Sequence, residues 1–157
     1  MDIEALTSIL DEFDITKVIP SLDSMLGKLV LLLRIIVMAG PLVMLGLGLY
    51  YFLASPKEAN HRAGYRFYYG MSKVATWQFT QRLAGIAYSA LGVVLTPVMA
   101  IICIRFGSMI APDMVMLAVK CVLWELVLVV VATLVVNFTV ILRYDRKGNL
   151  RSGKKKE

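Results

Sequence analysis

Three long apolar runs dominate the sequence, at residues 29–54, 83–104 and 114–142. About 20 mainly apolar residues in a helix cross the ~30 Å hydrocarbon core of a bilayer. Each run reaches that length and holds few charged residues. Because backbone polar groups in lipid must be satisfied within the segment, a helix is the expected form of each run. The sequence therefore predicts an all-α, multi-pass membrane protein with three transmembrane helices.

The composition agrees with this prediction. Hydrophobic residues make up 59% of the chain and charged residues 18%, and the mean hydropathy is +0.73. A typical soluble domain has roughly 45–50% apolar and about 25% charged residues. The formal net charge is nevertheless +6. Such an apolar chain is unlike a disordered protein, and we expect its basic excess to lie at the ends and loops and to serve no nucleic-acid partner.

The distribution of charge predicts the orientation. Residues 1–27 carry six acids and one base, and the 106–113 connection carries one acid and no base. The 54–82 loop carries five bases and one acid, and the 143–157 tail carries seven bases and two acids. Basic segments remain on the cytoplasmic side. We therefore expect a cell-membrane protein with its N-terminus outside and its C-terminus cytoplasmic, where the bases attract anionic lipid.

The acidic N-terminal segment, residues 1–27, has apolar residues at steps of three and four, which predicts an amphipathic helix. Pro20 and Ser21 are expected to divide it, with Ser21 as an N-cap. Its acidic start is unlike a secretory signal peptide, so the first apolar run is expected to remain as a span. Two arrangements of this segment stay open: it lies on the outer membrane surface, or it packs against the spans.

Small residues predict where the spans bend and meet. Gly40-Pro41 favours a kink in the first span. In the second span Gly85, Ser89 and Gly92 follow steps of four and three. This spacing places them on one helix face, where they allow a neighbouring helix to approach closely.

Three ionisable residues and one amide interrupt the apolar runs, namely Arg34, Lys120, Glu125 and Asn137. Ionisable groups within a bilayer are costly and often functional. Lys120 and Glu125 are five residues apart, about 140° around a helix at about 3.6 residues per turn, so a direct pair is poor. We favour an Arg34–Glu125 pair between helices. The alternative is that Arg34 and Lys120 extend to the outer interface while Glu125 is buried in its protonated form.

Catalytic and metal-binding patterns are not evident. His61 has no cysteine or second histidine near it, and Cys103 and Cys121 lie within apolar runs, as buried thiols do. A phosphate-cradling glycine loop and a paired-carboxylate site are also lacking. We therefore expect no enzyme activity, metal or cofactor.

The loop between the first two spans carries a spaced motif of six residues: Asn60, Gly64, Tyr65, Arg66, Ser72 and Trp77. Together with the Arg82–Gly85 step that follows, this motif resembles the signature of the SdpI family of bacterial membrane proteins. The resemblance covers roughly residues 35–105. It departs from the family at Phe67, where a threonine is usual, and the larger members have additional helices.

Each motif residue has an expected structural role. Gly64 can adopt a positive φ in a turn, and Arg66 can bond backbone carbonyls or a lipid phosphate. Ser72 is expected to cap a short helix that runs to Trp77 and into the second span. The indole of Trp77 is expected at the membrane interface with its N–H bonded. The alternative is that Asn60, Arg66 and Trp77 recognise a ligand or partner.

The resemblance implies a membrane interaction protein that gives immunity to a secreted toxic peptide, in some members coupled to signalling. The cytoplasmic loop would then capture a regulator protein, and the outer face would meet the toxin. Two other functions remain open. One is an oligomeric small transporter or channel subunit whose route is lined by Arg34, Lys120 and Glu125. The other is an accessory scaffold subunit that docks through its N-terminal helix.

Overall fold

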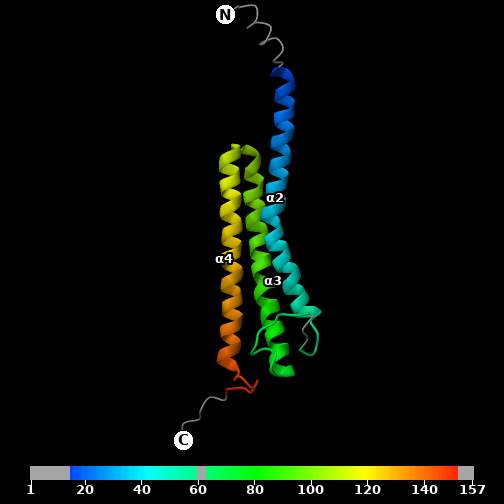
Figure 1. Ribbon diagram of the computed structural model, residues 1–157, viewed down its shortest axis with the longest axis vertical. Helices are drawn as coiled ribbons and strands as arrows, with labels where there is room; N and C mark the ends of the chain where they lie inside the picture. The colour runs from blue at the N-terminus through cyan, green and yellow to red at the C-terminus, as the bar shows by residue number, and fades with distance from the viewer. Residues whose placement is uncertain (1–14, 60–62, 152–157) are drawn as a thin grey trace, which may run out of the picture.

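The fold is a bundle of three long helices, seen in a computed structural model that describes residues 15–59 and 63–151. Helix α2 spans Ile15–Leu53, α3 spans Val74–Arg105 and α4 spans Ala111–Arg143; the short 3-10 helix η1, Phe106–Ser108, lies between α3 and α4. Every regular element in these ranges is helical. Figure 1 shows the three long helices running side by side, and each contacts the other two.

All three long helices are long and apolar enough to cross a membrane, which confirms the predicted three-span architecture. Many large aliphatic side chains point outward, as lipid contact requires, among them Leu31, Val93 and Leu134. Helix α3 begins at Val74, before the predicted start of its span. Its 32 residues measure about 48 Å at about 1.5 Å per residue, so it extends beyond the hydrocarbon core.

The predicted break at Pro20 and Ser21 is wrong, because α2 is continuous from Ile15 to Leu53. A proline removes only its own backbone donor, and the helix continues on both sides of it. Residues 23–28 are exposed, and Figure 1 shows this end of α2 extending beyond α3 and α4. Residues 23–28 therefore make little contact with the other spans. The rest of the predicted amphipathic segment, residues 1–14, lies outside the described residues.

The predicted small-residue face joins α2 to α3. A Cβ atom on Gly92 would lie 2.6 Å from the backbone nitrogen of Leu45, and one on Gly85 would lie 2.8 Å from Phe52. Ser89, between them, contacts Gly48 of α2. Figure 1 shows the cyan half of α2 inclined relative to its blue half. The stripe lies where the sequence indicated.

The two ends of the bundle differ. At the turn end, the α3–η1–α4 connection surrounds buried Phe106 and Met114. This cluster continues inward to Cys103 and Cys121, which are buried free thiols as predicted. At the opposite end, which we call the loop end, a second cluster contains Tyr65 and Tyr88. The α2–α3 loop and the tail after α4 both lie at the loop end (Figure 1).

Candidate functional site

The loop is fixed to the bundle through Gln81, a fully buried residue of α3. Its Nε2 donates to the carbonyl oxygen of Tyr65 at 2.7 Å, and the backbone nitrogen of Tyr65 donates to its Oε1 at 2.8 Å. The amide side chain thus satisfies both backbone groups of one loop residue. Gly64, just before it, has φ +102°, which confirms the expected turn position. The loop therefore has a defined path over α3.

Trp77 lies beneath this loop. Its side chain is fully buried, and its indole N–H donates to the carbonyl of Pro56 at 2.7 Å. A Cβ on Gly64 would come within 2.7 Å of the indole ring, so only glycine allows the loop to cross here. The N–H is bonded as expected, and the ring supports the loop from below.

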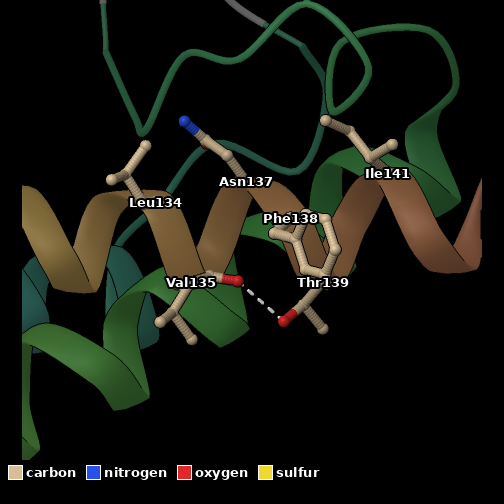
Figure 2. A pocket seen from close by; sticks show the side chains of 6 residues that line it. All are labelled: Leu134, Val135, Asn137, Phe138, Thr139 and Ile141. Atoms are coloured by element: carbon tan, nitrogen blue, oxygen red, sulfur yellow. Dashed lines mark hydrogen bonds between the residues drawn. The ribbon is translucent and has the colours of Figure 1, made fainter.

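Tyr65 joins the loop to α4. Its hydroxyl donates to Asn137 Oδ1 at 2.7 Å, and Figure 2 shows Asn137 pointing from α4 toward the loop, away from the side of Thr139. Burial, followed by the neighbouring phenols of Tyr88 and Tyr51, raises the pKa of Tyr65. The phenol therefore stays protonated and remains a hydrogen-bond donor. Asn137, predicted as an intramembrane polar residue, has its partner in the loop.

The tail forms a tight turn that completes the loop end. The carboxylate of Asp145 accepts the backbone N–H groups of Lys147 at 2.9 Å and Asn149 at 2.7 Å, and Gly148 has φ +71°. The Asn149 backbone bond is the largest of several contacts that hold the pKa of Asp145 below its ordinary value. Tyr144 and Leu150 pair across the turn.

This turn contacts the loop and the start of α3. Thr76 Oγ1 donates to the Gly148 carbonyl at 3.3 Å, and the ammonium of Lys73 donates to Asn149 Oδ1. Arg146 Nε donates to the Tyr69 hydroxyl at 3.2 Å. We call the combined surface of residues 54–59, 63–73 and 144–151 the loop-end platform.

The platform has a pocket of about 450 Å³ between loop and tail, lined by Ala59, Tyr68, Met71, Ser72 and Arg146. Tyr68 is 75% exposed, and Arg66, two residues before it in the loop, and Arg146 of the tail are also exposed. Ser72 does not cap the helix as expected: Lys73 occupies the cap position of α3, and Ser72 Oγ donates to the Tyr69 carbonyl at 2.8 Å. Asn60 lies outside the described residues.

The expected Arg34–Glu125 pair is wrong. Arg34 Nε instead donates to the carbonyl of Cys103 at 3.0 Å, near the C-terminal end of α3. Carbonyls at a helix C-terminus carry partial negative charge and attract a cation. Glu125 contacts α2 at Gly40, six residues beyond Arg34, which is about 9 Å along a helix at about 1.5 Å per residue. The guanidinium therefore has a nearer partner at its own depth.

Lys120 and Glu125 lie on different faces of α4, as their spacing predicted. Lys120 is exposed beside Leu123, Trp124 and Val127, whereas Glu125 is buried. Arg34, Lys120 and Glu125 thus occupy three separate surroundings. Within the described ranges they do not line one shared route.

The fold defines the class of protein: an all-helical, multi-pass membrane protein. Comparison with known proteins finds no matching family model, no matching curated protein and no matching solved structure. Proposals about function therefore depend on the geometry described above.

Sequence reasoning missed the residues that hold the platform together. Gln81 carried no motif signal, because a single glutamine at the start of a span resembles an interfacial polar residue. The tail turn did leave a signal, the Asp145–Asn149 stretch with glycine at its fourth position, which is typical of a turn. The basic charge of the tail obscured it.

Proposed function

We propose that this chain is a membrane interaction protein of the toxin-immunity and signalling type, as its resemblance to the SdpI family implies. The observation that carries the proposal is the loop-end platform. Three motif residues, Gly64, Tyr65 and Trp77, meet in the part of the loop that Gln81 fixes. Their positions suit a scaffold that presents the exposed residues beside them.

The exposed part of the platform favours an acidic partner. Arg66, Arg146 and Lys147 are exposed on it, and Tyr68 and Met71 give the neighbouring pocket an apolar wall. Arginine binds carboxylates through a planar fork of donors, and arginine and tyrosine are enriched among residues that dominate binding energy. An acidic, partly apolar segment of a regulator protein fits this chemistry.

The platform is proposed to face the cytoplasm. Its loop and tail lie at one end of the bundle and hold the basic segments, whereas the connection at the turn end holds none. The positive-inside rule then places the turn end outside, where the toxic peptide arrives. The remaining platform bases would lie near anionic headgroups of the inner leaflet.

A killing assay with matched variants tests the proposal. A host sensitive to an SdpI-type toxic peptide would express the chain at measured membrane abundance. We expect the unaltered protein to raise survival, and Arg66→Glu and Arg146→Glu to abolish the gain through charge repulsion of an acidic partner. Lys28→Glu is the control, because Lys28 is an exposed base of α2 that lies outside the platform.

Two results would count against the proposal. Absence of protection by the unaltered protein would contradict the immunity function. Equal protection by all three charge-reversed variants would contradict the role of the platform.

A further inference from the structure

A second feature is a cleft between α2 and α4, in the membrane-spanning part of the bundle. The cleft measures about 360 Å³, within the range of about 300–1,000 Å³ typical of small-ligand sites. Its walls are largely apolar and include Ile36, Val43, Leu47, Val122, Leu126 and Val129. Val43 and Leu126 are 58% and 57% exposed on the outer surface of the bundle. The cleft is therefore open to the hydrocarbon of the bilayer.

One carboxyl group lies in the wall of this cleft. Glu125 is 4% exposed, and its Oε1 has no hydrogen-bond partner among the residues that the structure describes. The carboxyl rests on α2 at Gly40, where an added Cβ would collide with it. The cleft thus offers a carboxyl oxygen that no donor of the described residues satisfies.

The nearby polar side chains are already engaged or face elsewhere. Arg34 donates to Cys103, and Lys120 lies on another face of α4. Tyr88, which also lines the cleft, pairs its hydroxyl with Thr133 Oγ1 at 2.6 Å. These side chains therefore supply no cation to Glu125, and a charged partner for it would come from outside the described part of the chain.

The depth of Glu125 in the membrane favours a charged partner. It lies 14 residues after Ala111, about 21 Å along a helix of about 50 Å in total, so it is near the middle of the span. A charged group at this depth is costly unless it has a partner. A cationic hydrogen-bond donor is the strongest partner for a carboxylate.

We propose that this cleft binds a lipophilic amine, with its protonated nitrogen donating to Glu125 and its apolar body between α2 and α4. The ligand enters laterally from the bilayer. An amine fits better than a fatty acid, whose charge would repel the carboxylate, and better than an alcohol, whose hydrogen bond lacks the charge. The inference does not depend on the immunity function.

The test uses the full chain in phosphatidylcholine nanodiscs, which carry no net charge to attract the probe. A photoreactive dodecylamine carrying a diazirine is the probe, and crosslinked residues are mapped by mass spectrometry. We expect saturable crosslinking that is concentrated on cleft residues and displaced by unlabelled dodecylamine. The matched photoreactive dodecanol is expected to bind about tenfold to a hundredfold more weakly, the range of one charge-assisted hydrogen bond.

Variants separate the carboxyl from the cleft. Glu125→Gln keeps the shape and removes the charge, so it is expected to weaken amine binding by the same factor. Val43→Phe keeps the carboxyl but fills the cleft, and it is also expected to prevent saturable labelling. Val131→Phe is the control, because Val131 is exposed on α4 and does not line the cleft. Diffuse labelling of all lipid-facing residues, equal affinity in Glu125→Gln, or equal affinity for dodecanol would overturn the proposal.

Discussion

Single buried polar side chains determine how the loop is held. Gln81 satisfies both backbone groups of Tyr65, and the indole N–H of Trp77 satisfies the carbonyl of Pro56. A buried backbone group that loses its partner costs about 1–3 kcal/mol. These residues therefore contribute more to the loop's conformation than its exposed arginines do.

Gln81→Leu is predicted to release the loop. The substitution leaves the N–H and the carbonyl of Tyr65 without side-chain partners, at about 1–3 kcal/mol for each group that remains buried. Limited proteolysis in detergent micelles should show faster cleavage within residues 54–73. Gln78→Leu is the control, since Gln78 is exposed with one 3.4 Å bond, and should stay within about 0.5 kcal/mol. Equal cleavage rates in both variants would show that Gln81 does not anchor the loop.

At the residue scale, some features of the loop and the spans could be predicted from the sequence and others could not. Glycine at residue 64 indicated a turn because only its conformational freedom makes a positive φ inexpensive. The partner of Arg34 was missed because the acceptor is a backbone carbonyl, which every residue has and no sequence pattern marks. The predicted pair with Glu125 was wrong for the same reason. Arg34 bonds a carbonyl at the helix terminus, and this acceptor leaves no mark in the sequence.

At the scale of elements, the small-residue face of α3 sets the distance to α2. Apolar periodicity and the Gly85–Ser89–Gly92 spacing were sufficient to predict the three spans and this contact, because both follow from helix geometry alone. The apolar run did not include the turns of α3 before residue 83, although the motif predicted a short helix there, from Ser72 to Trp77 and into the span. These turns contain buried Thr76, Trp77 and Thr80, whose polarity lowers hydropathy although the folded loop covers them.

Gly92→Ala is predicted to weaken the contact between α2 and α3. The new Cβ would lie 2.6 Å from the Leu45 nitrogen, so the backbones must separate, at about 1–3 kcal/mol for such overpacking. Gly46→Ala is the matched control: nothing lies within 4 Å of its Cβ, and alanine favours the helix by up to about 1 kcal/mol. Thermal denaturation in micelles measures both. A Gly92→Ala protein as stable as Gly46→Ala would show that the close approach is unnecessary.

The tail turn is predicted to open in acid. Hydrogen bonds from Asn149 and Lys147 hold the pKa of Asp145 below its ordinary value of 3.8. The stabilisation is therefore fully present above that value and is lost as the pH falls through the lower pKa of the folded state. The protection of the Lys147 and Asn149 amides against exchange, taken relative to the intrinsic rate at each pH and followed by NMR, should fall only below about pH 4.

Asp145→Asn should give the acid behaviour at neutral pH, because the amide is a weaker acceptor than the carboxylate. Asp113→Asn, at the opposite end of the bundle, should leave the exchange of the turn unchanged. Protection of both amides at pH 2 would mean that the carboxylate does not hold the turn.

At the scale of the whole molecule, three spans carry one platform at the loop end of the bundle. The loop and the tail are about 70 residues apart in the sequence, yet Thr76 bonds Gly148 and Tyr69 bonds Arg146. Charge counts predicted that these segments share a side of the membrane. Their packing into one surface depends on individual side-chain contacts that charge counts do not contain.

Labelling of introduced cysteines with a membrane-impermeant maleimide tests this central claim most directly. The native thiols of Cys103 and Cys121 are buried, so the unaltered protein provides the unlabelled background. In intact cells we predict labelling of Ser108→Cys, at the turn end, and none of Ser72→Cys or Arg151→Cys until the membrane is permeabilised. Labelling of Ser72→Cys in intact cells, or opposite accessibility of Ser72→Cys and Arg151→Cys, would contradict a three-span chain with its platform in the cytoplasm.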